Sequence, residues 1–252
     1  MRVNLEYLKG ADIGMKKIVC DSYEEICRFA ADIFAQTLRE KPDSVLGFAT
    51  GSTPIGLYDE LVKRYENGDI DFSKAQSFNL DEYYPIDPAH PQSYNSFMQK
   101  YLFSKINLSK SQLLDGSAAD PVAECARYDA EIEASGGVDL QLLGIGVNGH
   151  IAFIEPAQSY PLGTSLIELA EDTLVANSRF FEDGEAQPTT ALSVGLNAIF
   201  KTKRIMMLVT GAGKADVIKK LFEQTIHTDM PASLLHLHPD VTVIVDKAAN
   251  GE

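Results

Sequence analysis

The chain is short of cysteine, of long apolar runs and of positive charge. Its three cysteines, Cys20, Cys27 and Cys125, form no metal-spaced cluster and cannot all pair, which favours a reducing compartment such as the cytoplasm. No apolar run reaches the roughly 18 residues that span a bilayer, and residues 1–15 lack the apolar core and cleavage site of a signal peptide. We therefore expect a cytoplasmic protein with no membrane-spanning segment.

The shortage of positive charge bears on what the protein binds. Acidic residues outnumber basic ones by 36 to 22, and the formal net charge is −14. Nucleic-acid phosphates would be repelled over most of such a surface, so we expect no nucleic-acid partner. A small phosphorylated ligand would need a local group of backbone N–H donors and a few cations.

Strand and helix patterns alternate along the 252 residues, which is typical of an α/β protein with a mostly parallel sheet and helices on both faces. We expect strands at 16–20, 44–49, 75–80, 138–143, 204–209 and 241–245, and helices at 22–39, 54–65, 93–103, 121–135, 190–200 and 214–224. Between 157 and 188 the chain is turn-rich, and we expect it to be irregular. These patterns favour a single domain over 16–252 and a loose N-terminal extension over 1–15.

The most informative stretch, residues 144–156, reads GIGVNGHIAFIEP and follows the apolar run at 138–143. It places His150 and Glu155 just past the carboxyl end of a strand, where α/β proteins bind ligands. Two titratable side chains there suggest acid–base chemistry. The same glycines spell G-x-G-x-x-G, but they lie past mid-chain with no strand predicted after them, so NAD-dependent hydride transfer is the weaker interpretation.

Two strand-to-helix turns are candidates for binding a phosphate. In ATGSTP, the backbone N–H groups of Gly51, Ser52 and Thr53 lie at an expected helix N-terminus, which is an anion-binding arrangement. A well-capped turn explains the same residues equally well. In TGAGKAD, Lys214 begins a helix, where a cation is unfavourable without an anionic partner. A solvated surface lysine is the alternative there.

Two further motifs carry charge in apolar surroundings. Arg179 of VANSRFF either pairs with a carboxylate for structural reasons or binds a phosphate bidentately. In SFNLDEYYPID, Asp81 and Glu82 directly follow a buried strand. A carboxylate in such a dry site suits proton abstraction beside a carbonyl or an imine. Alternatively, Asp81 caps a helix and Glu82 is solvated.

Seven segments, taken in order, resemble the glucosamine-6-phosphate deaminase family, also called glucosamine-6-phosphate isomerase. They are ATGSTP, FNLDEY, HPQSYNSFM, GIGVNGHIAFIEP, VANSRFF, PTTALSVG and LHLHPDVTVIVD. The resemblance covers nearly the whole chain after Met15 and implies a three-layer, modified Rossmann-type α/β sandwich. It also implies conversion of glucosamine 6-phosphate and water into fructose 6-phosphate and ammonia, without a cofactor or a metal.

The resemblance further implies roles for individual residues. Asp81 would move a proton from C2 to C1, and His150 would assist the opening of the sugar ring. Asn148 and Glu155 would orient that histidine and tune its pKa. The phosphate contacts would fall on Gly51, Ser52, Thr53, Arg179 and Lys214.

The chain departs from the family pattern in three places. Ile154 stands where the family commonly has asparagine, and Asn148 stands where some members have aspartate. Residues 158–169 read QSYPLGTSLIEL and lack the basic stretch that helps regulated members bind N-acetylglucosamine 6-phosphate. We therefore expect no activation by that effector, and a homo-oligomer and a monomer both remain open.

Three other functions compete with this interpretation. A galactosamine-6-phosphate deaminase is the nearest, because the departure at Ile154 would fit a changed specificity at C4. A 6-phosphogluconolactonase-like hydrolase has a similar fold, but the Asp81–Glu82 pair and the HPQSY segment favour the deaminase. A non-catalytic sugar-phosphate-binding regulator would have no need of Asp81, His150 and Glu155 together.

Overall fold

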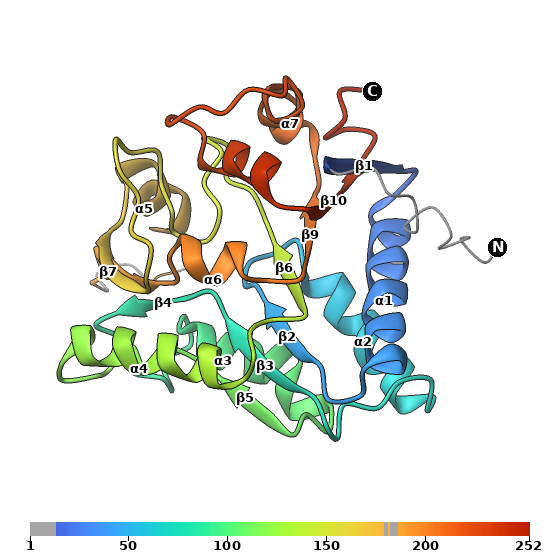
Figure 1. Ribbon diagram of the computed structural model, residues 1–252, viewed down its shortest axis with the longest axis horizontal. Coiled ribbons are helices and arrows are strands. Elements are labelled where there is room, and N and C mark those ends of the chain that lie inside the picture. The colour runs from blue at the N-terminus through green and yellow to red at the C-terminus, as the bar shows by residue number, and fades with distance from the viewer. Residues whose placement is uncertain (1–13, 179–180, 182–185) are drawn as a thin grey trace.

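The computed structural model describes residues 14–178, 181 and 186–252, and its centre is a seven-stranded sheet (Figure 1). In spatial order the strands are β1 (Gly14–Cys20), β10 (Asp240–Asp246), β9 (Arg204–Val209), β6 (Leu140–Leu143), β2 (Val45–Phe48), β3 (Gln76–Asn79) and β5 (Lys110–Gln112). Every neighbouring pair is parallel. The α/β class and the parallel sheet predicted from the sequence are confirmed.

Helices cover both faces of this sheet. They are α1 (Tyr23–Glu40), α2 (Ile55–Glu66), α3 (Tyr94–Tyr101), α4 (Pro121–Ala134), α5 (Glu171–Ser178), α6 (Leu196–Phe200) and α7 (Ala215–Leu221). Phe48 and Phe78 lie on neighbouring strands one position out of register, so their side chains point to opposite faces. The Phe48 ring stacks on Phe34 of α1 at 5.4 Å and meets Tyr58 of α2 edge-on, whereas the Phe78 ring meets Tyr128 of α4. The three layers follow from these contacts, and Figure 1 shows α1 and α2 on one side of the central strands and α4 on the other.

A second, three-stranded antiparallel sheet has the order β4 (Asp81–Tyr84), β8 (Thr190–Ser193), β7 (Ser165–Glu168). Only Leu80 separates β3 from β4, so the chain passes from one sheet into the other without a turn. The Leu80 carbonyl accepts a hydrogen bond from Val194 N at 2.9 Å, which fastens the two sheets together at this point.

The second sheet corrects the sequence-based prediction. Residues 190–200 were expected to form one helix, but 190–193 are strand and only α6 is helical. Likewise, β7 and α5 lie in the stretch at 157–188 that was expected to be irregular. The reason is that β8 pairs with β4 and β7, and such pairing between distant segments overrides local propensity.

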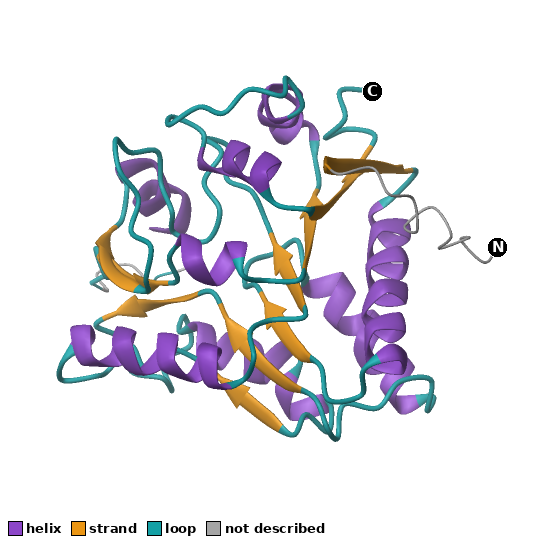
Figure 2. Ribbon diagram, viewed as in Figure 1, coloured by secondary structure: helices purple, strands orange, loops and turns teal. Residues whose placement is uncertain are grey.

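Most other elements agree with expectation within a few residues (Figure 2). Ser22 caps α1, as its spacing from Glu25 predicts, because its side chain accepts a hydrogen bond from Glu25 N at 3.2 Å. Strand β1 begins at Gly14, two residues earlier than expected; residues 1–13 lie outside the described part, so a loose extension stays a prediction. Among the described residues, no helix is long and apolar enough to cross a membrane.

Candidate active site

Four neighbouring strands, β9, β6, β2 and β3, end at one edge of the sheet because they are parallel. After β2 the chain adds β3 and β5 on one side of β2, and it then adds β6 on the opposite side of β2. The winding direction of the sheet therefore changes between β2 and β6. Ligands bind at this point in doubly wound sheets. The segments that follow these four strands carry, in the same order, Lys214, the 144–156 loop, the Gly51–Thr53 turn and Asp81, the first residue of β4.

Asp81 is the first residue of β4, where its backbone pairs with Ser193 of β8. The residue is 8% exposed, and no described residue makes a hydrogen bond or an ion pair with its carboxyl group. Burial, assisted by the neighbouring charge of Glu82, raises the pKa of Asp81 to about 8. A base whose pKa lies near the working pH can both take up and return a proton.

Glu82 caps a helix, which is the role that the sequence had suggested as an alternative for Asp81. It is 1% exposed, and its carboxylate accepts hydrogen bonds from the backbone N–H groups of Tyr94 at 2.8 Å and Asn95 at 2.9 Å, the first two residues of α3. Tyr83 N also donates to it, at 3.0 Å. Burial raises the pKa of Glu82 to about 7 even though these three donors oppose the rise. Glu82 therefore fastens α3 to β4, and it was not among the predicted site residues.

The loop after β6 brings the other three predicted catalytic side chains together. Asn148 Nδ2 donates to Glu155 Oε2 at 2.8 Å, and His150 Nδ1 lies 3.3 Å from the same oxygen, which is an ion-pair distance without hydrogen-bond geometry. Asn148 Oδ1 also accepts from the backbone N of His150 at 3.2 Å. One carboxylate thus faces both the ring and the amide.

Glu155 has a third neighbour, Thr173, that sequence reasoning missed. Thr173 of α5 donates to Glu155 Oε1 at 2.5 Å. Burial raises the pKa of Glu155, but His150, Thr173 and Asn148 together outweigh it and hold that pKa below its usual range. The carboxylate is therefore ionised at neutral pH. Nothing in the sequence around Thr173 indicates this contact, because it depends on the fold that places α5 over the loop.

The glycines of this loop are explained by close packing. A Cβ at Gly146 would lie 2.3 Å from Cε1 of His150. Gly149 has φ +83°, and a Cβ there would lie 2.5 Å from Cγ of Met230. Both positions require glycine so that the His150 ring and the segment at Met230 can approach the backbone. Two of the three glycines of the G-x-G-x-x-G spacing therefore have a structural reason that involves no dinucleotide, whereas a Cβ at Gly144 would meet nothing within 4 Å.

The turn after β2 leaves backbone donors available. Gly51, with φ +106°, and Ser52 are exposed, and no N–H group of Gly51, Ser52 or Thr53 donates to another described residue. Helix α2 begins at Ile55, and Pro54 at its N-cap supplies no side-chain cap. Unpaired N–H groups at a helix N-terminus form an anion site.

Lys214 connects two of the loops. It ends the 3₁₀ turn at Ala212–Lys214 before α7, and its Nζ donates to the carbonyl oxygen of Ile145 at 2.6 Å. Burial lowers the pKa of Lys214. It is thus partly buried at the strand ends, which differs from a solvated surface lysine. Arg179, the other predicted cation, lies outside the described residues.

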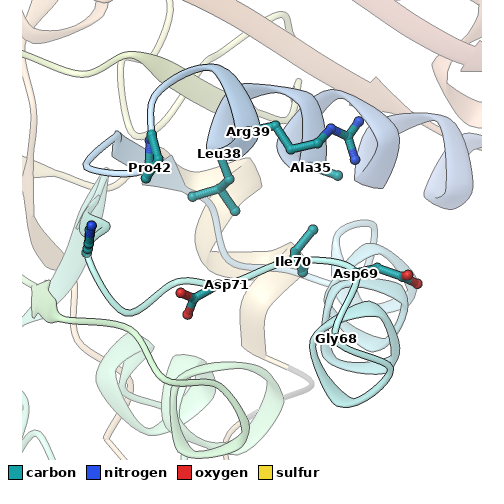
Figure 3. Close-up of a pocket in the computed structure, with 9 residues that line it drawn as sticks. Ala35, Leu38, Arg39, Pro42, Gly68, Asp69, Ile70 and Asp71 are labelled. Atoms are coloured by element: carbon teal, nitrogen blue, oxygen red, sulfur yellow. The ribbon is translucent and has the colours of Figure 1, made fainter.

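Two cavities of the structure lie away from this edge. One of about 360 Å³ is formed by the end of α1 and the segment before β3 (Figure 3), at the amino ends of the strands. Its lining is Ala35, Leu38, Arg39, Pro42, Gly68, Asp69, Ile70, Asp71 and Lys74. No predicted site residue lines it. In the described part of the chain, no group of three or more His, Cys, Asp and Glu side chains is arranged to hold a metal ion.

Comparison with known proteins agrees with this geometry. The family model of glucosamine-6-phosphate isomerases/6-phosphogluconolactonase matches residues 21–244. The glucosamine-6-phosphate deaminase of Thermoanaerobacter pseudethanolicus is 47% identical over 237 residues, which cover 93% of this chain and 94% of that protein. The enzyme of the same name from Halothermothrix orenii is also 47% identical, with 93% and 98% covered.

Solved structures of both kinds of protein in the family superpose on this chain. A monomeric glucosamine-6-phosphate deaminase superposes with a TM-score of 0.90 at 42% identity, covering 94% of this chain and 99% of that one. The 6-phosphogluconolactonase of Thermotoga maritima has a TM-score of 0.73 at 19% identity, covering 92% and 100%, and this likeness concerns the fold alone. The chain belongs to the glucosamine-6-phosphate isomerase/6-phosphogluconolactonase family.

Proposed function

We propose that this protein is a glucosamine-6-phosphate deaminase, which converts glucosamine 6-phosphate and water into fructose 6-phosphate and ammonia. The observation that carries the proposal is the buried carboxyl group of Asp81, which has no partner among the described residues and lies at the same sheet edge as His150 with its carboxylate neighbour Glu155. The relatives that are 47% identical over 93% of the chain have this activity in their names and support the same reaction.

The residues divide the reaction between them. The Gly51–Thr53 turn, Lys214 and Arg179 hold the phosphate, and His150 transfers the proton that opens the sugar ring. Asp81 removes the proton from C2 of the open chain, which leaves an enolamine, and returns it to C1. Water then adds to the resulting imine at C2, and ammonia leaves. Each step moves only protons and water, so one carboxylate and one imidazole suffice for acid–base catalysis.

Glu155 and Asn148 orient the imidazole. Glu155 is ionised and lies beside Nδ1 of His150, so it favours the tautomer with a proton on Nδ1 and leaves Nε2 as the acceptor for a substrate proton. Asn148 Nδ2 donates a hydrogen bond to the same carboxylate oxygen at 2.8 Å.

The three buried free thiols fit a reducing compartment, and we infer a cytoplasmic location on that ground.

The test is ammonia release from glucosamine 6-phosphate and galactosamine 6-phosphate, measured side by side with hydrolysis of 6-phosphogluconolactone. We expect ammonia and fructose 6-phosphate from the glucosamine ester, and loss of both in Asp81→Asn. Preference for the galactosamine ester would change the substrate but keep the reaction. Hydrolysis of the lactone without ammonia release from either amino sugar would overturn the proposal.

A further inference from the structure

We propose that Tyr23 is a positioning residue for the phosphate-binding turn. Its hydroxyl group links α1 to the end of the turn after β2 and to the start of α2, and so holds the N–H groups of the Gly51–Thr53 segment in the orientation that binds an anion. This inference rests on the proposed phosphate role of that turn. Tyr23 itself needs no contact with the ligand.

The Tyr23 hydroxyl both donates and accepts a hydrogen bond. Tyr23 is the first residue of α1, and its hydroxyl donates to the carbonyl oxygen of Thr53 at 2.8 Å. The same oxygen accepts from the backbone N–H of Gly56 at 2.8 Å. One phenol therefore joins the peptide unit that closes the turn to the first turn of α2.

Other hydrogen bonds of the turn run from the Tyr58 hydroxyl to the carbonyl oxygen of Ala49 and from Ile55 N to Ser52 O at 3.4 Å, and neither holds the Thr53–Pro54 peptide unit. Pro54 has no N–H group, so the Thr53–Pro54 peptide unit can be held only through its carbonyl oxygen, which Tyr23 contacts. Helix α2 has no side-chain cap of its own, and the N–H of Gly56 is one of the donors that a helix N-terminus leaves unpaired. The Tyr23 hydroxyl takes the place of a capping side chain, although it comes from another helix.

Close approach of the two helices makes this contact possible. A Cβ at Gly56 would lie 2.8 Å from the Tyr23 hydroxyl oxygen and 2.8 Å from Sγ of Cys27. Glycine at this position lets the phenol reach the α2 backbone. Burial raises the pKa of Tyr23 to about 12, so the hydroxyl keeps its proton and donates at any working pH.

A turn held in the binding conformation loses less entropy when the ligand arrives. The phosphate is not altered in the reaction, so its contacts are the same in the ground state and the transition state. Weakening them raises KM and leaves kcat nearly unchanged. A residue that served only to stabilise the fold would change the melting temperature without this selective effect on KM.

The test is Tyr23→Phe, which removes the hydroxyl oxygen alone. We expect the KM for glucosamine 6-phosphate and the dissociation constant of inorganic phosphate, measured by calorimetry, to rise together by about 3- to 30-fold, as for loss of one or two hydrogen bonds. The kcat should change by less than about twofold. Tyr84→Phe is the matched control, because it also removes a phenol–carbonyl hydrogen bond, to Ala118 O at 3.0 Å, and should leave KM and phosphate binding unchanged.

If Tyr23→Phe does not fold, Gly56→Ala disturbs the same contact from the other side and should weaken phosphate binding in the same way. Unchanged phosphate affinity in a folded Tyr23→Phe, or an equal loss in Tyr84→Phe, would overturn the role of Tyr23. Phosphate binding needs no turnover, so this result is separate from the ammonia assay: a wild-type protein that binds phosphate but releases no ammonia would overturn the proposed function and leave Tyr23 in place.

Discussion

Oε2 of Glu155 lies 3.3 Å from Nδ1 of His150, and this is the only carboxylate that the described structure places within ion-pair distance of the ring. Glu155→Gln keeps the size of the side chain and removes its charge. We expect kcat for ammonia release to fall by about 10²-fold or more, because the imidazole loses the partner that selects its tautomer and stabilises its cation.

The control for this variant is Thr173→Val, which removes the hydrogen bond to Glu155 Oε1 and keeps the carboxylate. We expect a much smaller loss of kcat from it. Equal losses in the two variants would mean that the position of α5, and not the charge of Glu155, supports the reaction.

Asp81→Asn should abolish turnover and leave substrate binding largely intact. Loss of a positioned base costs about 10²–10⁴-fold in rate, and Asp81 makes no hydrogen bond or ion pair with a described residue that the substitution would disturb. Steady-state rates, with calorimetric binding of a non-reacting substrate analogue, measure the two effects separately. A variant with most of its activity would show that Asp81 is not the base.

The same variant should be more stable than the wild-type protein at alkaline pH. The folded pKa of Asp81, about 8, is raised above the ordinary value for an unfolded chain, so the folded state binds the extra proton and stability falls as the pH rises from about 4 to 8. Asp81→Asn removes this penalty. We expect a gain of about 1–3 kcal/mol in the free energy of unfolding near pH 8 and little gain near pH 4.

Denaturant unfolding of both proteins at the two pH values measures this difference. A gain that is equal at pH 4 and pH 8 would mean that the carboxylate charge is not its cause. In the wild-type protein, activity should rise over the pH range in which stability falls, because the base must be ionised. We expect kcat/KM to rise with pH up to about 8.

The sequence predicted the strands whose carboxyl ends carry the candidate site, but it did not predict the second sheet, and the reason is physical. Asp81, His150 and Lys214 follow apolar runs that read locally as buried strands, and parallel strands bring their carboxyl ends to one edge wherever they lie in the order. By contrast, β8 at Thr190–Ser193 is a strand only because β4 and β7 flank it. No local pattern carries that information.

Strand β4, which the sequence did not predict, separates the two adjacent carboxylates of the candidate site. Consecutive residues of a strand point to opposite faces, so Asp81 and Glu82 are in different surroundings although they are neighbours in sequence. Glu82 meets the N-terminus of α3, and the side chain of Asp81 is left without a partner among the described residues. Without the strand, the local sequence pattern gave no means of deciding which carboxylate caps a helix and which one is the candidate base, and only the family resemblance pointed to Asp81.

Lys214→Ala should weaken binding of the phosphorylated sugar more than it slows the chemistry. Its Nζ has donors to spare beyond the hydrogen bond to Ile145 O, and an acidic protein needs cations for a phosphate. We expect KM to rise with kcat less affected, and Arg179→Ala, at a position outside the described residues, to behave in the same way. A fall in kcat at unchanged KM would show instead that Lys214 acts through the catalytic loop that it contacts at Ile145.

N-acetylglucosamine 6-phosphate is expected not to activate the enzyme, and the substrate curve is expected to be hyperbolic. A phosphate effector needs a cationic pocket, but residues 158–169 contain no lysine or arginine, and Glu168 on the exposed edge strand β7 adds a negative charge. A ligand that does not bind two conformations differently cannot shift their populations. Initial rates over a range of substrate, with and without the effector, decide the matter. A sigmoidal curve that the effector makes hyperbolic would show that cations from elsewhere, such as a neighbouring subunit, complete a regulatory site.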